Sequence, residues 1–276
     1  MLLSIAYNML GDRAEAEDIV QDVLLRWEQT SKEAVRNAKS YLVKATVNSV
    51  LNYRASAHKQ RLTYPNIWLP EPLPDAVVPM DTPAGEIRSA LTYELMVLIR
   101  ELSPDELAVF VLKEAFDFSH EEIGEILDKR PDHSRQLLKR AREKVGRASN
   151  SRSPLNESDL ELAQRVVEAI SRADVDALRA LFTTDIRLVA DGGGKVAASP
   201  APILGSEKVA HLLVTAARKT DFTPRFEILF LNRQPAFLVY REQEPLGAFI
   251  LTPAEGRVER MYAVLNPDKL RSFPGA

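Results

Sequence analysis

Hydrophobic and polar residues follow the period of an amphipathic helix through the first 62 residues. Gly11 is expected to end an opening helix, and Asp12 with Glu15 three positions later predicts a capping box at the start of the next one. One face of that second helix carries apolar residues at helical spacing: Ala16, Ile19, Val20, Val23, Leu24 and Trp27. After a loop near residues 30–37, a long helix is expected from about Lys39 to Gln60. The pattern therefore predicts a helical first domain, residues 1–62.

The helical period returns in residues 86–147. Helices are expected from about Glu86 to Glu101, and from Ser103-Pro-Asp-Glu through Glu114, and Ser119 caps a short amphipathic helix, HEEIGEIL. A short turn separates this helix from a basic amphipathic one within residues 129–147, which hold eight Lys or Arg against two acids. Helix, turn and basic helix is the layout of a helix-turn-helix that binds the DNA major groove.

Residues 157–276 differ from the first two domains, because strand-like runs follow the helices. Two helices, at about 157–171 and 174–182, precede a strand at Ile186–Ala190, and another helix is expected near 206–219. Strand-like runs follow at Arg225–Leu231, Ala236–Arg241, Leu246–Thr252 and Arg257–Leu265. Helices first and strands afterwards predict an α+β domain with one curved sheet, mixed or antiparallel, wrapped on helices.

Two linkers separate these three domains. Residues 63–85 hold six prolines, which interrupt helices and favour an extended linker, and residues 148–156 form a short polar linker. The chain is thus expected to be a multidomain protein, with two all-α domains followed by an α+β domain. With no cysteine and four scattered histidines among 276 residues, neither a disulfide nor a metal site is expected.

Charge is distributed unevenly, although the net charge is only −3. Residues 12–33 carry seven acids against three bases, whereas residues 34–61 carry six bases and no acid. A basic segment inside an acidic protein indicates a local site for a polyanion, and acidic surface elsewhere suits a protein partner. No apolar run approaches the roughly 18 residues that cross a bilayer, so a cytoplasmic protein that does not enter the membrane is expected.

The first two domains resemble the extracytoplasmic-function sigma factors, a class of sigma-70-type subunits that start bacterial transcription. The resemblance rests on AEDIVQDVLLRW (16–27), YLVKATVNSVLNY (41–53) and EEIGEIL…SRQLLKRAREKV. Three further motifs resemble the group-41 subfamily, in which a C-terminal domain is fused: WLPEP (68–72), DGGGK (191–195) and NPDKL (266–270). The resemblance implies a SnoaL-like cone for residues 157–276, and it implies no cofactor.

The resemblance implies promoter DNA as a partner, bound by two basic helices. Near the start of the second helix of the helix-turn-helix, Ser134, Arg135 and Gln136 are expected to meet base edges of the −35 element, while Lys139, Arg140 and Arg142 hold phosphate. In the first domain, Asn48 matches an Asn that reads a flipped base of the −10 element in some sigma factors of this class. Backbone contacts are expected from Lys44, Arg54, Lys59 and Arg61. For the residues of the helix-turn-helix, a solvated basic helix face is the alternative explanation. For Asn48, the alternative is an ordinary polar residue of a helix.

Core RNA polymerase is the second implied partner. The expected contacts with the clamp helices of its largest subunit are Asp18, Gln21, Asp22, Leu25 and Arg26. A plain acidic surface is the alternative. Regulation is expected to come from the fused domain rather than from a separate anti-sigma protein.

The three subfamily motifs are expected to form an interdomain latch. Its residues are Trp68, Leu69, Pro70, Glu71, Pro72, Asp191, Gly192, Gly193, Gly194, Lys195, Asn266, Pro267, Asp268, Lys269 and Leu270. A tryptophan in a proline-rich linker indicates an anchor, because an exposed indole is costly. The glycine cluster with Lys195 also fits a phosphate-binding loop, but the GxxxxGK[ST] spacing is missing.

A catalytic role for the C-terminal domain is the main rival hypothesis. Asp185, His211, Asp221 and Tyr240 are candidates by residue type, yet nothing in their spacing places them together, so no catalytic residue is assigned. A repressor with a helix-turn-helix is the third alternative, although such a repressor would need only one basic DNA-binding helix. The cone leaves room for a small apolar ligand.

Overall fold

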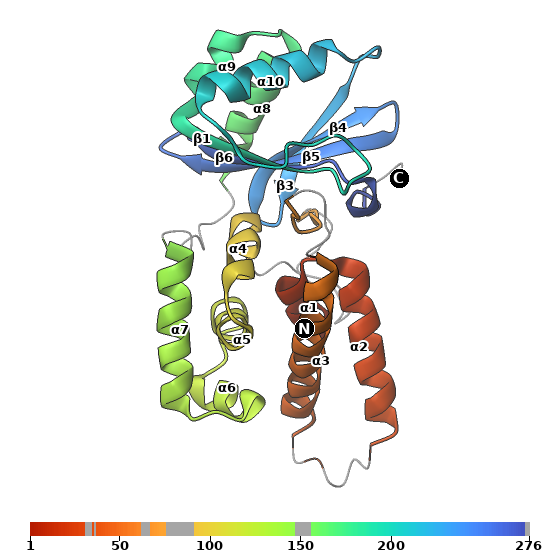
Figure 1. Cartoon of the computed structure of the whole chain (residues 1–276), viewed down its shortest axis with the longest axis vertical. Coiled ribbons are helices and arrows are strands. Elements are labelled where there is room, and N and C mark those ends of the chain that lie inside the picture. The colour runs from red at the N-terminus through yellow and green to blue at the C-terminus, as the bar shows by residue number, and fades with distance from the viewer. Residues whose placement is uncertain (31–34, 36, 62–66, 76–90, 147–155, 274–276) are drawn as a thin grey trace. The chain divides into compact units, whose positions relative to one another are not determined.

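The computed structural model describes residues 1–30, 35, 37–61, 67–75, 91–146 and 156–273 (Figure 1). These residues fall into two compact units. The first unit contains residues 1–61 and 91–146, and the second contains 67–75 together with 156–273. The described part of the proline-rich segment therefore packs with the C-terminal domain, although in sequence it separates the two helical domains.

Three helices form the first domain: α1 (Leu2–Leu10), α2 (Arg13–Glu28) and α3 (Ala38–Arg61). Gly11 ends α1 in the left-handed conformation, at φ 70°, as expected. The Asp12 carboxylate accepts the N–H of Glu15 at the start of α2, which is one of the two hydrogen bonds of the expected capping box. Tyr7, Val23 and Val47 are buried between the helices. Leu24 was expected on the apolar face of α2, and its side chain is 43% exposed.

The second helical domain begins with α4 (Tyr93–Leu98), which continues as a 3₁₀ turn, Ile99–Glu101. The helix was expected to start at Glu86, but α4 starts at Tyr93. Thr92 is extended, and its hydroxyl caps the helix by accepting the N–H of Leu95. Residues 86–90 lie outside the described residues. Then α5 (Pro104–Phe110) runs into a π-helical turn, Val111–Ala115.

The helix-turn-helix consists of α6 (His120–Leu127) and α7 (Pro131–Val145), as the sequence predicts. Ser119 and Glu122 form a reciprocal capping box at the start of α6. Gly124 is required where α6 approaches the turn, because a Cβ there would lie 2.6 Å from the carbonyl oxygen of Lys129. On α7, the expected core residues Leu137, Leu138, Ala141 and Val145 are buried.

The second unit is an α+β domain, as expected. Its helices are α8 (Glu157–Ser171), α9 (Val175–Leu181) and α10 (Ser206–Arg218), and Figure 1 shows them over one face of the sheet. Six strands form that sheet in the order β2-β1-β6-β5-β4-β3. Their bounds are β1 (Phe182–Asp191), β2 (Ile203–Leu204), β3 (Arg225–Leu231), β4 (Gln234–Arg241), β5 (Glu244–Ala254) and β6 (Arg257–Val264).

The sheet is mixed, because β1 and β6 pair in parallel while the other neighbours are antiparallel. The sequence missed the two-residue strand β2 and placed the start of β1 four residues late. Helices and sheet enclose one core that includes Val166, Leu178 and Met261, each fully buried. Burying such a side chain contributes roughly 1.5–3 kcal/mol. Among the described helices, none combines the length and apolar character needed to cross a bilayer.

Candidate nucleic-acid interface and linker clamp

The helix α3 carries the candidate residues for the −10 element. Asn48 is exposed on it, and Lys44 is half-buried, with its Nζ 2.5 Å from a carboxylate oxygen of Asp128 in the turn of the helix-turn-helix. Arg54 donates instead to the carbonyl oxygen of Met9 at 2.7 Å, which ties α3 to the end of α1. The side chains of Lys59 and Arg61 lie outside the described residues.

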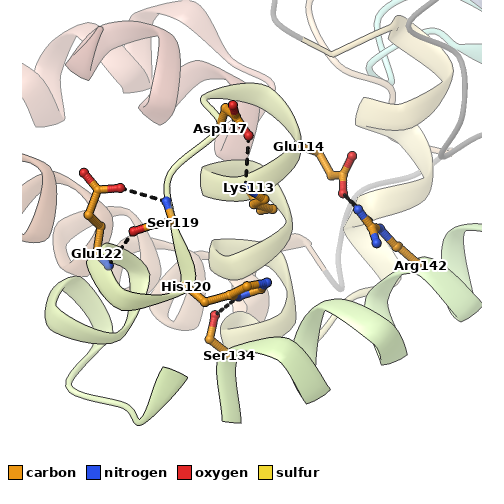
Figure 2. A network of polar contacts seen from close by, with 8 residues as sticks. All are labelled: Lys113, Glu114, Asp117, Ser119, His120, Glu122, Ser134 and Arg142. Carbon is orange, nitrogen blue, oxygen red and sulfur yellow. Dashed lines mark hydrogen bonds and ion pairs between the residues drawn. The ribbon is translucent and has the colours of Figure 1, made fainter. Parts of the chain in front are cut away.

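The residues expected to contact bases at the start of α7 do not all face outward. Ser134 is fully buried, and its hydroxyl lies 2.9 Å from Nδ1 of His120 (Figure 2), so it joins the two helices and is unavailable to DNA in this structure. Burial, followed by the nearby charge of Arg135, lowers the pKa of His120. We therefore correct the expectation for Ser134, whose position on the inner face of α7 could have been read from its spacing to Leu137, Leu138 and Ala141.

The basic side chains of α7 lie on its exposed face, and several are paired with acids. Arg135 contacts both Asp132 and Glu121. Arg142 reaches Glu114 at 2.5 Å, and this pair is drawn in Figure 2. Gln136, Lys139 and Arg140 are exposed on the same helix. Exposed ion pairs are worth about 0–1 kcal/mol, so phosphate can replace these carboxylates at little cost.

One acid partner of α7 was not predicted from the sequence, and it stabilises the packing of this helix. Glu106 on α5 is buried and accepts Nζ of Lys144 at 2.7 Å, while its other contact is the capping box with Ser103. Burial raises the pKa of Glu106, but the hydrogen bonds from Lys144 and Ser103 outweigh this and lower it. The pair fixes the end of α7 against α5.

The helix α2 presents a mixed apolar and acidic face. Asp18, Gln21, Asp22, Leu25 and Arg26 are all exposed. Leu24 and Leu25 are 43% and 50% exposed, and with Val20 and Gln21 they line a groove of about 280 Å³ between α2 and the start of α1. Exposed leucines surrounded by charge are typical of a surface that binds another protein.

The WLPEP, DGGGK and NPDKL motifs meet around one carboxylate, that of Asp191 at the end of β1. One oxygen of this fully buried carboxylate accepts the N–H of Leu69 at 2.9 Å and Nζ of Lys269 at 2.7 Å. The same Nζ donates to the carbonyl oxygen of Leu69 at 2.6 Å and lies 3.9 Å from the ring centre of Trp68. We call Trp68, Leu69, Asp191 and Lys269 the linker clamp.

The remaining motif residues shape the clamp. The other Asp191 oxygen accepts the N–H of Gly193, whose φ is +63° and whose added Cβ would lie 2.3 Å from Cγ of Asn266. Gly192 is equally restricted, since a Cβ there would lie 2.0 Å from the carbonyl oxygen of Val196. Lys195 pairs with Asp268 at 2.5 Å on the outside and lowers the pKa of that carboxyl. Pro70, Glu71, Pro72 and Leu270 are buried, and Gly194 and Pro267 complete the turns.

A second attachment of the linker was not predicted. Leu73 exchanges two hydrogen bonds with Asn232, donating to its side-chain oxygen at 2.7 Å and accepting its backbone N–H at 2.9 Å. Asp75 accepts the N–H of Arg233, and burial is the main reason that the pKa of Asp75 is raised. Asn-Arg between two strands indicates a tight turn, with positive φ at both residues, but the sequence does not reveal its partner.

The structure does not bring the candidate catalytic residues together. His211 pairs with Glu207 on the exposed side of α10, Tyr240 is buried on β4, and Asp185 and Asp221 are exposed elsewhere. None of these four lines the cavity of the cone. In the described part of the chain, no group of three or more His, Cys, Asp or Glu side chains could hold a metal ion.

Comparison with known proteins matches both helical domains to families. Residues 1–60 match the family model "Sigma-70 region 2", and residues 92–145 match "Sigma-70, region 4". The ECF RNA polymerase sigma factor SigJ of Mycobacterium tuberculosis is 27% identical over 290 residues, spanning 99% of this chain and 91% of that protein. The probable ECF RNA polymerase sigma factor SigI of the same organism is 24% identical, spanning 98% and 91%.

A solved structure agrees over the same extent. The crystal structure of Mycobacterium tuberculosis SigJ superposes with a TM-score of 0.76 at 25% identity, and covers 100% of this chain and 96% of its own. The similarity therefore includes the C-terminal domain as well as the two sigma-70 regions.

Proposed function

Because this chain belongs to the extracytoplasmic-function sigma factors with a fused SnoaL-like domain, we propose that it directs core RNA polymerase to promoters under the control of that domain. It is an initiation factor and not an enzyme. Initiation takes place where the polymerase works, in the cytoplasm. The observation that carries the regulatory part is the linker clamp, which binds the segment between the two sigma domains to the C-terminal domain.

Helix α2 is the proposed surface for core polymerase. Its exposed Leu24 and Leu25 lie beside Gln21 in an open groove, and Asp18, Asp22 and Arg26 surround them. Burying two half-exposed leucines on a partner supplies apolar contact, while the charged rim supplies orientation. The clamp helices of the largest polymerase subunit are the partner that we assign to this face.

Promoter DNA is assigned to α3 and α7. Asn48 would take a base of the −10 element, with Lys44 on the backbone, and Gln136 and Arg135 would face the −35 element. Lys139, Arg140 and Arg142 would hold phosphate, and Arg54 contributes by fixing α3 to α1 rather than by touching DNA. Ser134 is left out because it is buried.

The linker clamp is the proposed element of control in cis. The linker connects region 2 to region 4, so holding its middle at Leu69 and Leu73 limits how far the two regions can separate. This arrangement makes a separate anti-sigma protein unnecessary. Polymerase or another ligand would then change activity by favouring one arrangement of the linker over another.

A contact between the two sigma domains supports a closed resting state. Lys44 of α3 pairs with Asp128, Lys39 lies 5.3 Å from the ring centre of Phe118, and Asn8 accepts the N–H of Leu91. While Lys44 is paired in this way it cannot hold the DNA backbone. Binding of DNA therefore requires this contact to open. Because each of these interactions is weak, opening it requires little free energy.

Binding to core polymerase tests the proposal directly. Purified core enzyme is titrated against fluorescently labelled full-length protein, and Leu25→Glu is expected to weaken binding at least tenfold. Leu204→Glu is the matched control, since Leu204 is a leucine exposed to a similar degree, 52%, on β2 of the C-terminal domain. Failure of the wild-type protein to bind core enzyme would refute the proposal, and equal loss in both variants would remove the role of α2.

A further inference from the structure

Strand β3 forms a long open edge of the sheet in the second unit. The sheet ends in β2 on one side, which has only two residues, and in β3 on the other. In contrast to β2, β3 has seven residues, RFEILFL, and pairs with β4 without a break in register. Apart from Arg225 and Glu227 its residues are apolar, and most of them are only half-buried. A long, regular and apolar edge strand is a template for pairing with another strand.

The proline-rich linker occupies one end of this edge. The N–H of Asp75 donates to the carbonyl oxygen of Phe230 at 3.1 Å. Alternate residues of an antiparallel strand direct their N–H and C=O groups to the same side, so those of Ile228 and Phe226 face the same open side as the carbonyl of Phe230. Within the described part of the chain, no neighbour forms a hydrogen bond with these two residues on that side. The edge therefore stays open beyond the linker.

We propose that β3 pairs antiparallel with β3 of a second copy of this chain, about a twofold axis at Phe226. The N–H and C=O groups of the two Phe226 residues then bond to each other, and the N–H of Ile228 donates to the carbonyl oxygen of the second copy's Pro224. The charges make the strand complementary to itself. Arg225 and Glu227 lie two positions apart on one face, so this axis places each Arg225 opposite a Glu227 of the other copy.

The neighbouring registers are less favourable. An axis at Glu227 would place two carboxylates directly opposite each other, and like charges in that position are destabilising. An axis at Ile228 would require the carbonyl oxygen of Phe230, which already accepts the N–H of Asp75. Because only residues 224–228 of each copy pair, the interface stays below the area of a standard complex, and a Kd of roughly 10–100 µM is expected. This dimer does not depend on the proposed function.

Sedimentation velocity of the full-length protein over roughly 1–300 µM tests the self-association. The wild type is expected to change from monomer to dimer across this range. Arg225→Glu and Glu227→Arg should each weaken association roughly tenfold, because either change places like charges opposite each other on both sides of the axis. A wild type that stays monomeric would leave the edge to a different protein and would overturn the proposal.

An equimolar mixture of the two variants separates charge pairing from damage to the fold. In the mixed dimer every charge at these two positions faces an opposite charge, so the mixture should associate about as tightly as the wild type. Arg257→Glu is the matched control, because Arg257 is an exposed arginine at the start of β6, an inner strand of the same sheet. It should leave the Kd unchanged. A mixture that associates no better than either variant alone would contradict the pairing.

An engineered disulfide tests the register. The chain has no cysteine, so Phe226→Cys introduces a single thiol, which the axis places opposite its own copy. The Cα atoms of a hydrogen-bonded antiparallel pair lie about 5.5 Å apart, within the range that a disulfide spans. Leu229→Cys is the control, since its two copies would lie roughly 20 Å apart. Under mild oxidation Phe226→Cys should crosslink roughly tenfold faster. Equal rates would overturn the register, and if Phe226→Cys does not fold, the charge variants still decide.

Discussion

Asp191 is the residue on which the linker clamp depends. It is a fully buried carboxylate paired with an almost fully buried ammonium group, and each charge is tolerated only because the other is present. In addition to the ion pair, the hydrogen bonds to Leu69 fix the direction of the linker. The single carboxylate thus converts three separate motifs into one contact.

Removing one charge of this pair should destabilise the second unit. Asp191→Ala is expected to lower the free energy of unfolding by about 3–5 kcal/mol, because the ammonium of Lys269 is left buried and unpaired. The chain has two tryptophans, so in a Trp27→Phe background Trp68 alone reports denaturant unfolding of the clamp. The double variant Asp191→Asn/Lys269→Met should recover much of the loss.

Lys195→Gln is the matched control for this prediction. It removes an ion pair of the neighbouring motif, with Asp268, that is exposed rather than buried. A change of no more than about 1 kcal/mol is expected. Equal effects of the two substitutions would show that the Asp191–Lys269 pair has no special role.

His120 should make the helix-turn-helix sensitive to acid. Burial and neighbouring cations lower its pKa in the folded protein below the ordinary 6.5, so the unfolded chain binds the proton more readily. The stability that the neutral ring contributes is therefore present above pH 6.5 and is lost as the pH falls through the lower, folded pKa. Denaturant unfolding at pH 7.5 and 5.5 measures this, and His120→Gln should reduce the difference. An unchanged pH dependence would contradict it.

At the scale of elements, we propose that α7 contacts phosphate and bases through different side chains. Lys139→Gln should weaken binding to any duplex and reduce the slope of log K against log salt by about one, because one phosphate contact is lost. Gln136→Ala should leave that slope unchanged while altering sequence preference. Fluorescence anisotropy over a salt series measures both. Lys208→Gln, on α10, is the control and should change neither.

The elements themselves could largely be predicted from the sequence. Caps and glycine stops set the helix boundaries at Gly11, Ser103 and Ser119, because these signals act within a few residues. Strands β3 to β6 are runs of at least seven residues with many apolar side chains, whereas β2 has two residues and no pattern to detect. The start at Glu86 was wrong because Thr92 offered a competing cap that the pattern did not weigh.

The candidate sites could be predicted only in part, because a contact depends on the tertiary structure. The three motifs of the clamp could be found in the sequence, but not the role of Lys269 in contacting Leu69 and Asp191 together. Asn232 and Asp75 do not lie in a recognisable motif, because each accepts a hydrogen bond from a backbone N–H that is far away in the sequence. The inward position of Ser134 was not predicted, because the basic residues beside it on α7 indicated a DNA-binding face.

At the scale of the whole molecule, we propose that the two DNA-binding domains of this sigma factor hold each other closed. The Lys44–Asp128 pair is the contact that can be changed most cleanly. Asp128→Asn should raise the affinity for DNA by roughly two- to fivefold, because an exposed ion pair is worth up to about 1 kcal/mol. Asparagine also tolerates the left-handed backbone at this position.

Asp117→Asn is the control for this effect. Asp117 is another left-handed aspartate of the same domain, and its carboxylate pairs locally with Lys113, so the charge change and the backbone demand are the same. Anisotropy with a labelled duplex compares the two variants. A similar gain in both would mean that net charge, and not release of Lys44, increases the affinity.

Run-off transcription with purified core polymerase tests the central claim most directly. The template is the region upstream of the protein's own gene, and the wild-type chain is compared with Asp191→Asn/Lys269→Met and with Lys195→Gln. Initiation is expected only when the protein is present, with a severalfold change in output for the double variant and wild-type output for Lys195→Gln. Initiation that does not depend on the protein would contradict its role as a sigma factor. Unchanged output from the double variant would contradict control by the linker clamp.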